Sequence, residues 1–206
     1  MSFEVDVQCA LGDVIIGTTF STGPGLTALF APSGAGKTSI LNMVAGLLRP
    51  DRGRIAVGQR VLFDSSADIN VPPERRRAGY VFQDRRLFPH LRVRANLVYG
   101  QRIARAADQV MTFDDAVDFL GIGHLLDRWP RNLSGGEAQR VAIGRALLSG
   151  AHFLLMDEPL SSLDAARREE IIGVIERIRD QLNMPMLYVS HDRAEVERLA
   201  ANIITL

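Results

Sequence analysis

A glycine-rich segment between a predicted strand and a predicted helix restricts the fold of this 206-residue chain more than any other feature. Leu26–Phe30 is apolar, as a buried strand would be, and Lys37–Leu48 has the apolar spacing of a helix. The segment comprises Ala31, Pro32, Ser33, Gly34, Ala35, Gly36, Lys37, Thr38 and Ser39. Inward-facing N–H groups around a triphosphate require glycine, a lysine reaches the terminal phosphates, and a hydroxyl helps to hold Mg²⁺. The segment predicts a phosphate-binding loop, although Ala31 stands where a glycine is usual.

Alternating strand and helix patterns predict an α/β fold with a mostly parallel central sheet. Before residue 84 the expected strands are Phe3–Ala10, Val14–Thr19, Leu26–Phe30, Arg54–Val57, Arg60–Phe63 and Gly79–Phe82. After residue 150 we expect strand His152–Met156, helix Ala165–Leu182, strand Met186–Ser190, helix Arg193–Ala200 and strand Asn202–Leu206. Residues from about 84 to 150 are mostly helical in pattern, and we interpret them as a subdomain inserted into one domain, 1–206. The early helix should bury Ile40, Leu41, Val44 and Leu47 and end at the turn Pro50–Gly53.

Composition and charge exclude several classes of protein. Lysine plus arginine equals aspartate plus glutamate at 24 each, so we expect no nucleic-acid partner. The single cysteine, Cys9, excludes an intramolecular disulfide and fits a reducing, cytosolic compartment as a small buried residue. The start of the chain does not resemble a signal peptide, and no apolar run approaches the roughly 20 residues that cross a bilayer. Work at a membrane would therefore need a separate spanning partner.

Two adjacent acids, Asp157 and Glu158, directly follow the expected strand His152–Met156. Alone, this pattern would indicate any buried strand that reaches solvent. Together with a phosphate-binding loop it has a chemical use. Asp157 would hold Mg²⁺ through its water shell, and Glu158 would polarise the water that attacks the γ-phosphate.

The run Leu133–Glu137 also has two interpretations. Ser134 followed by Glu137 predicts a capping box at the start of a helix. Such a cap does not require the two glycines Gly135 and Gly136, whose N–H groups at a positive helix end suit an incoming phosphate. Beside a phosphate-binding loop, the second interpretation is favoured.

Six sequence elements, in this order, resemble those of the ATP-binding-cassette (ABC) ATPases. They are the phosphate-binding loop, Gln83 within Tyr80–Gln83, the signature Leu133–Glu137, the acids Asp157 and Glu158, Ser161–Asp164, and Ser190–Asp192. The resemblance extends over essentially the whole chain. It implies a P-loop NTPase fold with an amino-terminal antiparallel β subdomain and the inserted helical subdomain. It also implies ATP hydrolysis with Mg²⁺.

The resemblance implies roles for single residues. The expected metal ligands are Thr38, Gln83 and Asp157. The expected catalytic residues are Lys37, Glu158 and His191. Gln83 would also signal to a membrane partner, and His191 would bond the γ-phosphate and position the water. Without their neighbours, Gln83 would be interpreted as a polar residue at a strand end and His191 as a structural histidine.

ABC ATPases form head-to-tail dimers, so the resemblance implies a composite site. Ser134, Gly135 and Gly136 would meet the nucleotide held by the phosphate-binding loop of a second copy. Asp164 resembles an aspartate that links the two sites, although it would also suit a helix start. The aromatic residue that often stacks on adenine is absent from Gln8–Gly12. Leu11 is left to contact the base, so a preference for ATP over GTP is not fixed.

Finer similarity lies in Val61–Ser65, Pro72–Arg77 and Phe82–Leu91, which resemble the ABC subunits that import molybdate. That subfamily usually carries a C-terminal oxyanion-binding domain, which the sequence up to Leu206 lacks. The implied partners are a second copy, a membrane permease and an upstream solute-binding protein. The chain would lie peripherally on the cytoplasmic face of the inner membrane, with the residues around Leu87–Leu91 against the permease.

Two other functions use some of these residues. A soluble, non-transport ABC ATPase of DNA repair or translation usually carries long coiled-coil or extra-domain insertions, and no heptad run is present here. A small P-loop kinase would explain Lys37 and Thr38 and leave the signature, Gln83 and His191 without a role. The sequence favours the importer.

Overall fold

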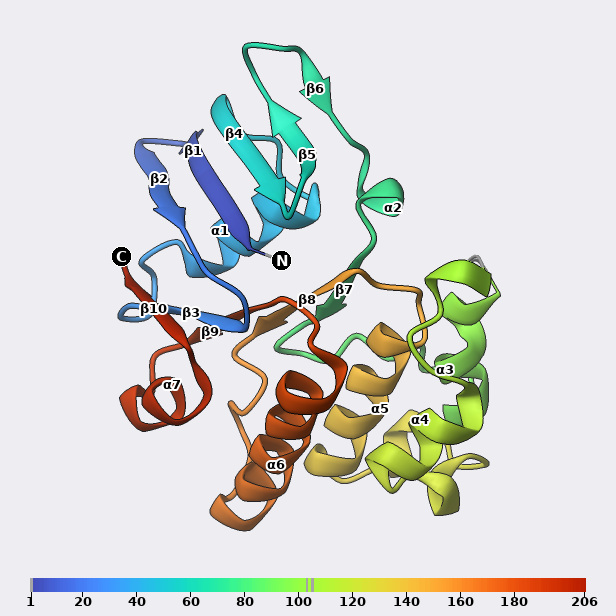
Figure 1. Ribbon diagram of the computed structural model, residues 1–206. Coiled ribbons are helices and arrows are strands. Elements are labelled where there is room, and N and C mark those ends of the chain that lie inside the picture. Colours follow the sequence, from blue (N-terminus) through green and yellow to red (C-terminus); the bar gives the residue numbers. More distant parts are fainter. Residues whose placement is uncertain (1, 103, 105) are drawn as a thin grey trace.

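The computed structural model describes residues 2–102, 104 and 106–206, and its strands form two five-stranded sheets (Figure 1). The first sheet is antiparallel, with the order β2-β1-β4-β5-β6. Its strands are β1 (Phe3–Leu11), β2 (Val14–Ser21), β4 (Arg52–Val57), β5 (Arg60–Asp64) and β6 (Ile69–Asn70). Alternate side chains of β1 are buried from Phe3 to Cys9, as in a sheet with one face on the core. The expected burial of Cys9 is confirmed.

The second sheet is parallel, with the order β10-β3-β9-β8-β7. Its strands are β3 (Leu26–Phe30), β7 (Ala78–Val81), β8 (Phe153–Asp157), β9 (Met186–Ser190) and β10 (Asn202–Thr205). Every residue of β8 and β9 is buried, because helices or the other sheet cover both faces. The expected α/β fold with a parallel central sheet and an antiparallel β part is confirmed. Parallel strands also bring the residues that follow them to one edge.

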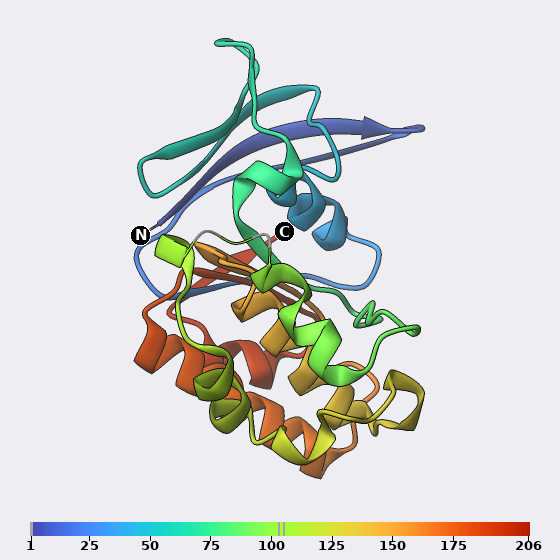
Figure 2. The same cartoon turned by 90° about the vertical axis from the view of Figure 1, so that its right-hand side faces the viewer.

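Helices cover the two faces of the parallel sheet unequally. The helices are α1 (Lys37–Ala45), α2 (Pro73–Arg76), α3 (Val93–Gln101), α4 (Phe113–Leu120), α5 (Gly135–Leu147), α6 (Ala165–Leu182) and α7 (Arg193–Leu199). Helix α1 packs between the two sheets, whereas α3 to α6 lie on the far side of the parallel sheet (Figure 2). Within the described residues, the chain between β7 and β8 contains helices and turns but no strand. No helix in the described part of the chain is both long and apolar enough to span a bilayer.

Several predicted boundaries are wrong for local reasons. Helix α1 ends at Ala45 because Gly46 takes a left-handed φ of 83°, and Leu47 is consequently exposed instead of buried. Strand β4 begins at Arg52, so the predicted turn Pro50–Gly53 runs into a strand. The sequence did not predict β6 and α2, which are too short to show a periodic pattern.

A buried arginine closes the carboxyl end of α1. The Nη1 atom of Arg76 donates to the carbonyl oxygens of Met43 at 2.7 Å and Val44 at 3.0 Å. Its Nε atom donates to the carbonyl oxygen of Val71 at 2.7 Å. The residue is only 1% exposed, and burial lowers the pKa of its guanidinium to about 10. Because it fills the space beside Gly46, a Cβ there would lie 2.6 Å from the Arg76 Nε atom.

We expect Gly46→Ala to destabilise the fold by about 2 kcal/mol or more, because alanine resists the left-handed backbone and collides with Arg76. Gly173→Ala is the matched control. Gly173 lies inside α6, and a methyl group added to it would meet no other element of the described chain within 4 Å, so alanine should stabilise by about 0.5–1 kcal/mol. Urea denaturation of the two variants measures both effects. Equal shifts in the same direction would contradict the packing around Arg76.

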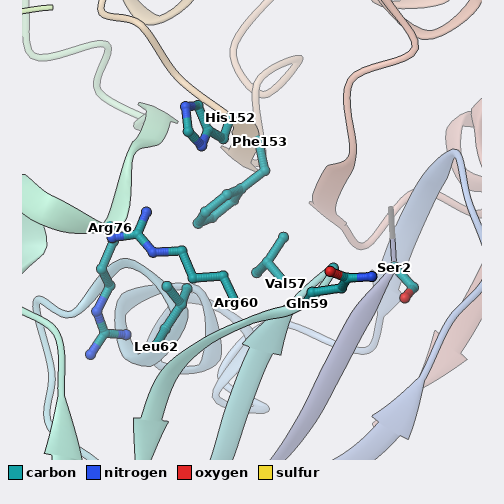
Figure 3. Close-up of a pocket in the computed structure, with 9 residues that line it drawn as sticks. Ser2, Val57, Gln59, Arg60, Leu62, Arg76, His152 and Phe153 are labelled. Atoms are coloured by element: carbon teal, nitrogen blue, oxygen red, sulfur yellow. The ribbon is translucent and has the colours of Figure 1, made fainter. Parts of the chain in front are cut away.

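Arg76 also borders a cavity of about 730 Å³ at the amino-terminal edge of the parallel sheet (Figure 3). Figure 3 shows the Phe153 ring projecting from β8 toward Arg60 and Val57 of the β4–β5 hairpin. The Arg76 guanidinium is bonded to chain carbonyls and to Asn70, so its donors serve the fold. This cavity lies opposite the edge at which the predicted site residues gather.

Candidate functional site

Predicted site residues from four parallel strands meet at the carboxyl edge of the sheet. The phosphate-binding loop follows β3, and Gln83 follows β7. Glu158 and His191 follow β8 and β9, and Asp157 is the last residue of β8. A pocket of about 440 Å³ at this edge is lined by Ile16, Ser33, Gly34, Gly36, Lys37, Thr38, Ser39, Gln83 and Glu158. Segments distant in the sequence thus line one pocket.

The phosphate-binding loop contains two left-handed glycines. Gly34 and Gly36 have φ angles of 85° and 86°, a region in which glycine has no steric penalty. The Ala35 N–H donates to the Pro32 carbonyl at 3.3 Å and tightens the loop. A Cβ on Gly36 would lie 2.8 Å from the Cγ2 atom of Ile16, so the β1–β2 hairpin also requires glycine there. No side chain caps α1 at Gly36, and its first N–H groups can therefore bind an anion.

Lys37 is the only lysine of the chain, and the loop encloses its ammonium group. The side chain is 4% exposed, and Nζ donates to the carbonyl oxygens of Ala31 at 2.6 Å and Pro32 at 2.8 Å. The Glu158 Oε1 atom lies 4.0 Å from Nζ. These contacts hold a positive charge beside the loop, where the terminal phosphates of a triphosphate would need it.

Asp157 and Thr38 form the contact expected of a metal site. The Thr38 hydroxyl donates to the Asp157 Oδ1 atom at 3.1 Å. Burial raises the pKa of Asp157, and the charge of Glu158 raises it further, although the Thr38 hydrogen bond opposes both effects. The ionised form therefore costs free energy in the fold at neutral pH, and a bound cation would offset that cost. With the Gln83 amide in the adjoining pockets, the oxygen donors fit Mg²⁺.

Glu158 has a strained backbone and lies against His191. Its φ is 43°, a left-handed value that costs a side-chain-bearing residue about 1–3 kcal/mol. Its Oε1 atom lies 3.2 Å from the Nδ1 atom of the His191 ring, which is 53% exposed. The same oxygen lies 4.0 Å from Lys37 Nζ, so the carboxylate is close both to the lysine of the phosphate-binding loop and to the imidazole. This geometry suits a base that takes a proton from a water.

The signature residues lie at the start of α5, and the capping box is confirmed. Ser134 accepts a hydrogen bond from the Glu137 N–H at 3.3 Å, and Glu137 accepts one from the Ser134 N–H at 2.6 Å. The glycines also have a packing role that the sequence did not predict. A Cβ on Gly135 would lie 3.0 Å from Leu163, and one on Gly136 would lie 3.4 Å from the Arg167 Cβ. Neither pocket at the sheet edge is lined by Ser134 or these glycines.

Asp164 is the N-cap of α6. Its side chain accepts a hydrogen bond from the Arg167 N–H at 3.0 Å and pairs with the Arg167 guanidinium at 2.9 Å. Within one chain it therefore serves a helix start, the simpler of the two interpretations that the sequence allows. A role between two subunits stays a prediction.

The structure adds residues to the site that the sequence analysis missed. Ile16 reaches the phosphate-binding loop from β2. A second pocket of about 640 Å³ shares Thr38 and Gln83 with the first. Its wall includes a Tyr80–Phe82 stack with ring centroids 3.9 Å apart, and Arg86 lies 4.1 Å from the Phe82 centroid. No local pattern marks the Ile16 contact, because it joins the loop to a strand distant in the sequence.

The segment around Leu87–Leu91 is fixed by a buried asparagine. Asn96 accepts a hydrogen bond from the Phe88 N–H at 2.8 Å and donates to the carbonyl oxygens of Phe88 and Leu91. The Phe88 ring is half-buried, 4.5 Å from the Tyr99 ring and 5.1 Å from the Arg145 guanidinium carbon. Tyr99 remains exposed beside it. The segment thus presents an ordered aromatic surface.

Comparison with known proteins relates this geometry to one family. Residues 17–161 match the family model described as ABC transporter. The chain is 55% identical over 206 residues to the molybdenum import ATP-binding protein ModC of Mesorhizobium japonicum, covering 100% of the chain and 56% of the relative. It is 54% identical over 197 residues to ModC of Paramagnetospirillum magneticum, covering 96% and 54%. The chain therefore spans about half the length of these curated relatives.

Solved structures give the same result for the fold. A dimeric ATP-binding cassette in a post-hydrolysis state, bound to ADP and Pi, matches with a TM-score of 0.78 and 25% identity, covering 100% of this chain and 94% of that one. CbiO1 from Clostridium perfringens, described as part of an ABC transporter complex, matches with a TM-score of 0.81, covering 99% and 83%. Its 24% identity supports the fold alone.

Proposed function

Because the chain belongs to the ABC transporter family, we propose that it binds and hydrolyses ATP with Mg²⁺ and thereby drives a membrane importer. One observation carries the proposal. Thr38, bonded to Asp157, and Glu158, in contact with His191, line the same pocket as the enclosed Lys37. A metal-binding pair, a base with its partner and a phosphate-binding cation are the parts that phosphoryl transfer to water requires.

Each group acts on a different part of the reaction. The loop N–H groups and Lys37 hold the phosphates, and Thr38, Gln83 and Asp157 hold the metal ion. When bound, Mg²⁺ neutralises charge on the β- and γ-phosphates. Glu158 accepts a proton from the attacking water. His191 bonds the γ-phosphate and fixes the water's direction.

We also propose that the site is completed by a second copy of the chain. The signature Ser134–Gly136 lines neither pocket of its own chain, yet its helix start offers phosphate donors. In a head-to-tail dimer these donors would cover the phosphates held by the partner, with Asp164 near the contact. The similar cassette is dimeric, which supports a dimer of this chain.

The proposed cargo is molybdate or a related oxyanion, which follows from the names of the relatives. The partners would be a membrane permease and an upstream solute-binding protein. The chain would act peripherally on the cytoplasmic face of the inner membrane, with Phe88 and its neighbours against the permease. Direct docking of a half-buried aromatic surface would transmit closure of the dimer to the permease.

Complementation between two inactive chains tests the composite site. Lys37→Ala removes the phosphate cation, and Ser134→Glu places a carboxylate where the γ-phosphate of the partner would lie. Each variant alone should lack ATPase activity, whereas their mixture should recover part of the wild-type rate, because a mixed dimer contains one intact site. Wild-type activity should also rise more steeply than linearly at low protein concentration. No recovery in the mixture, with a strictly linear wild-type rate, would contradict the proposal.

A further inference from the structure

A buried carboxylate lies behind the turn that carries His191. Glu195 belongs to the first turn of α7 and is 7% exposed. Its Oε2 atom accepts hydrogen bonds from the Tyr188 hydroxyl at 2.9 Å and the Ser190 hydroxyl at 2.8 Å. Both donors are buried residues of β9. The carboxylate thus ties the end of β9 to the start of α7 across the turn.

The residue after His191 belongs to the same cluster. The Asp192 N–H donates to the Ser190 hydroxyl at 3.0 Å, so Ser190 both donates and accepts within the cluster. The Asp192 side chain accepts from the N–H groups of Ala194 at 2.9 Å and Glu195 at 3.3 Å and caps α7. Each neighbour of His191 is therefore fixed, while the imidazole itself remains exposed and touches Glu158.

Helix α6 supplies a counter-charge to this cluster. The Arg168 Nη1 atom lies 3.2 Å from the Asp192 Oδ2 atom, and its Nε atom lies 3.7 Å from the Glu195 Oε1 atom. Arg168 stands one turn after Asp164, the N-cap of α6. The turn that holds His191 is thereby joined to the helix whose start is predicted to face the second subunit.

A role in the helix cap alone does not explain Glu195. An acid in the first turn of a helix interacts favourably with the helix dipole while exposed to water, at no cost of burial. Here the Glu195 carboxylate is buried against Tyr188. Burial of the Tyr188 phenol raises its pKa well above the usual value, and the nearby Glu195 carboxylate raises it further. The phenol therefore stays protonated and remains a donor. Two hydroxyl donors and the nearby Arg168 guanidinium offset the cost of burying the Glu195 carboxylate.

We propose that Glu195 is a positioning residue for His191. Through Tyr188 and Ser190 it fixes the end of the strand before the histidine, and through the Ser190 hydroxyl, which accepts from the Asp192 N–H, it also holds the backbone after it. It so directs the imidazole toward Glu158. Because its side chain is buried, Glu195 would act through these residues and not on the reacting groups directly. The inference rests on the proposed ATPase function, since it assigns His191 the task of orienting the attacking water.

Glu195→Gln tests the proposal, because it keeps the shape and removes the charge that holds both hydroxyls. We expect kcat for ATP to fall about 10- to 100-fold, as for a misplaced reacting group, with KM changed less than about twofold. Tyr188→Phe removes one of the two bonds and should have a smaller effect in the same direction. Glu197→Gln is the matched control, because Glu197 lies two residues further on, exposed and paired with Arg193, and its kcat should not change.

An NMR titration of the His191 imidazole gives a second readout that does not depend on turnover. The chain has four histidines, so the His191 signal is assigned with a His191→Ala variant. In the nucleotide-free protein, Glu195→Gln should shift or broaden this signal, and Glu197→Gln should not. If Glu195→Gln does not fold, Tyr188→Phe gives the same comparison with smaller amplitude.

The outcomes separate the two proposals. An inactive wild type would remove the ATPase function, while a shifted His191 signal in Glu195→Gln would still support positioning. An active wild type together with an unchanged kcat and an unchanged His191 signal in Glu195→Gln would overturn the positioning role.

Discussion

Glu158→Gln is expected to lower the turnover of ATP by about 10²- to 10⁴-fold, the contribution of a general base, with little loss of ATP affinity. Glutamine has nearly the shape of glutamate but cannot accept the water proton. The phosphate-binding contacts of Lys37 do not depend on the Glu158 charge, since Nζ is already bonded to two loop carbonyls. Binding and hydrolysis should therefore separate in this variant.

A second consequence follows if two chains form the site. Without hydrolysis, ATP should hold the two copies together, and Glu158→Gln with MgATP should elute from gel filtration as a dimer. The control is Glu169→Gln, which removes an exposed carboxylate of α6 paired with Arg198 and should behave as wild type. Normal turnover by Glu158→Gln would remove Glu158 from the role of base and leave another group to take the proton.

Local rules were enough to predict the elements that carry the site. Helix Ala165–Leu182 and strand Met186–Ser190 have the predicted bounds. A capping residue and a turn residue mark the ends of the helix, and a short apolar run marks the strand. The end of α1 was misplaced because apolar residues continue past Gly46. What stops the helix there is the left-handed glycine packed against Arg76, which is distant in the sequence. A local pattern cannot contain such a contact.

The candidate site likewise contains residues that the sequence predicted and residues that only the structure reveals. Order and spacing in the sequence located Lys37, Thr38, Asp157, Glu158 and His191, which the fold brings to one edge. Ile16 and Glu195 were missed, since an apolar residue in a strand and an acid in a first helical turn are both ordinary in those places. Only the distances to Gly36 and to Tyr188 reveal what they contact.

The signature shows why a sequence pattern can have two causes. Its glycines suit an incoming phosphate, and they also pack against Leu163 and Arg167 of the same chain. Replacement of either glycine would therefore disturb the fold as well as any contact with a partner. Ser134→Glu is the better probe of the partner's site, because the Ser134 side chain is only half-buried and loss of its capping hydrogen bond costs only about 1 kcal/mol.

Lys37→Ala is expected to weaken ATP binding by about 30- to 5,000-fold, since removing one member of a buried charge pair costs about 2–5 kcal/mol. The ammonium lies against the loop carbonyls of Ala31 and Pro32 and pairs with Glu158 at the pocket. Its loss leaves the loop N–H groups to hold the terminal phosphates alone. Titration calorimetry with MgATP measures the change, and thermal unfolding shows whether the variant remains folded.

The sequence offers a direct control for this assignment, because Lys37 is the only lysine. Selective ¹³C labelling of lysine gives one set of side-chain signals in the wild-type protein. MgATP should move these signals in the wild-type protein. If tight binding needs closure of the dimer, the same concentration of MgATP should leave the signals of Ser134→Glu in place. If MgATP binds the wild type tightly without moving the lysine signals, then the phosphates lie away from the loop, and the proposed site is wrong.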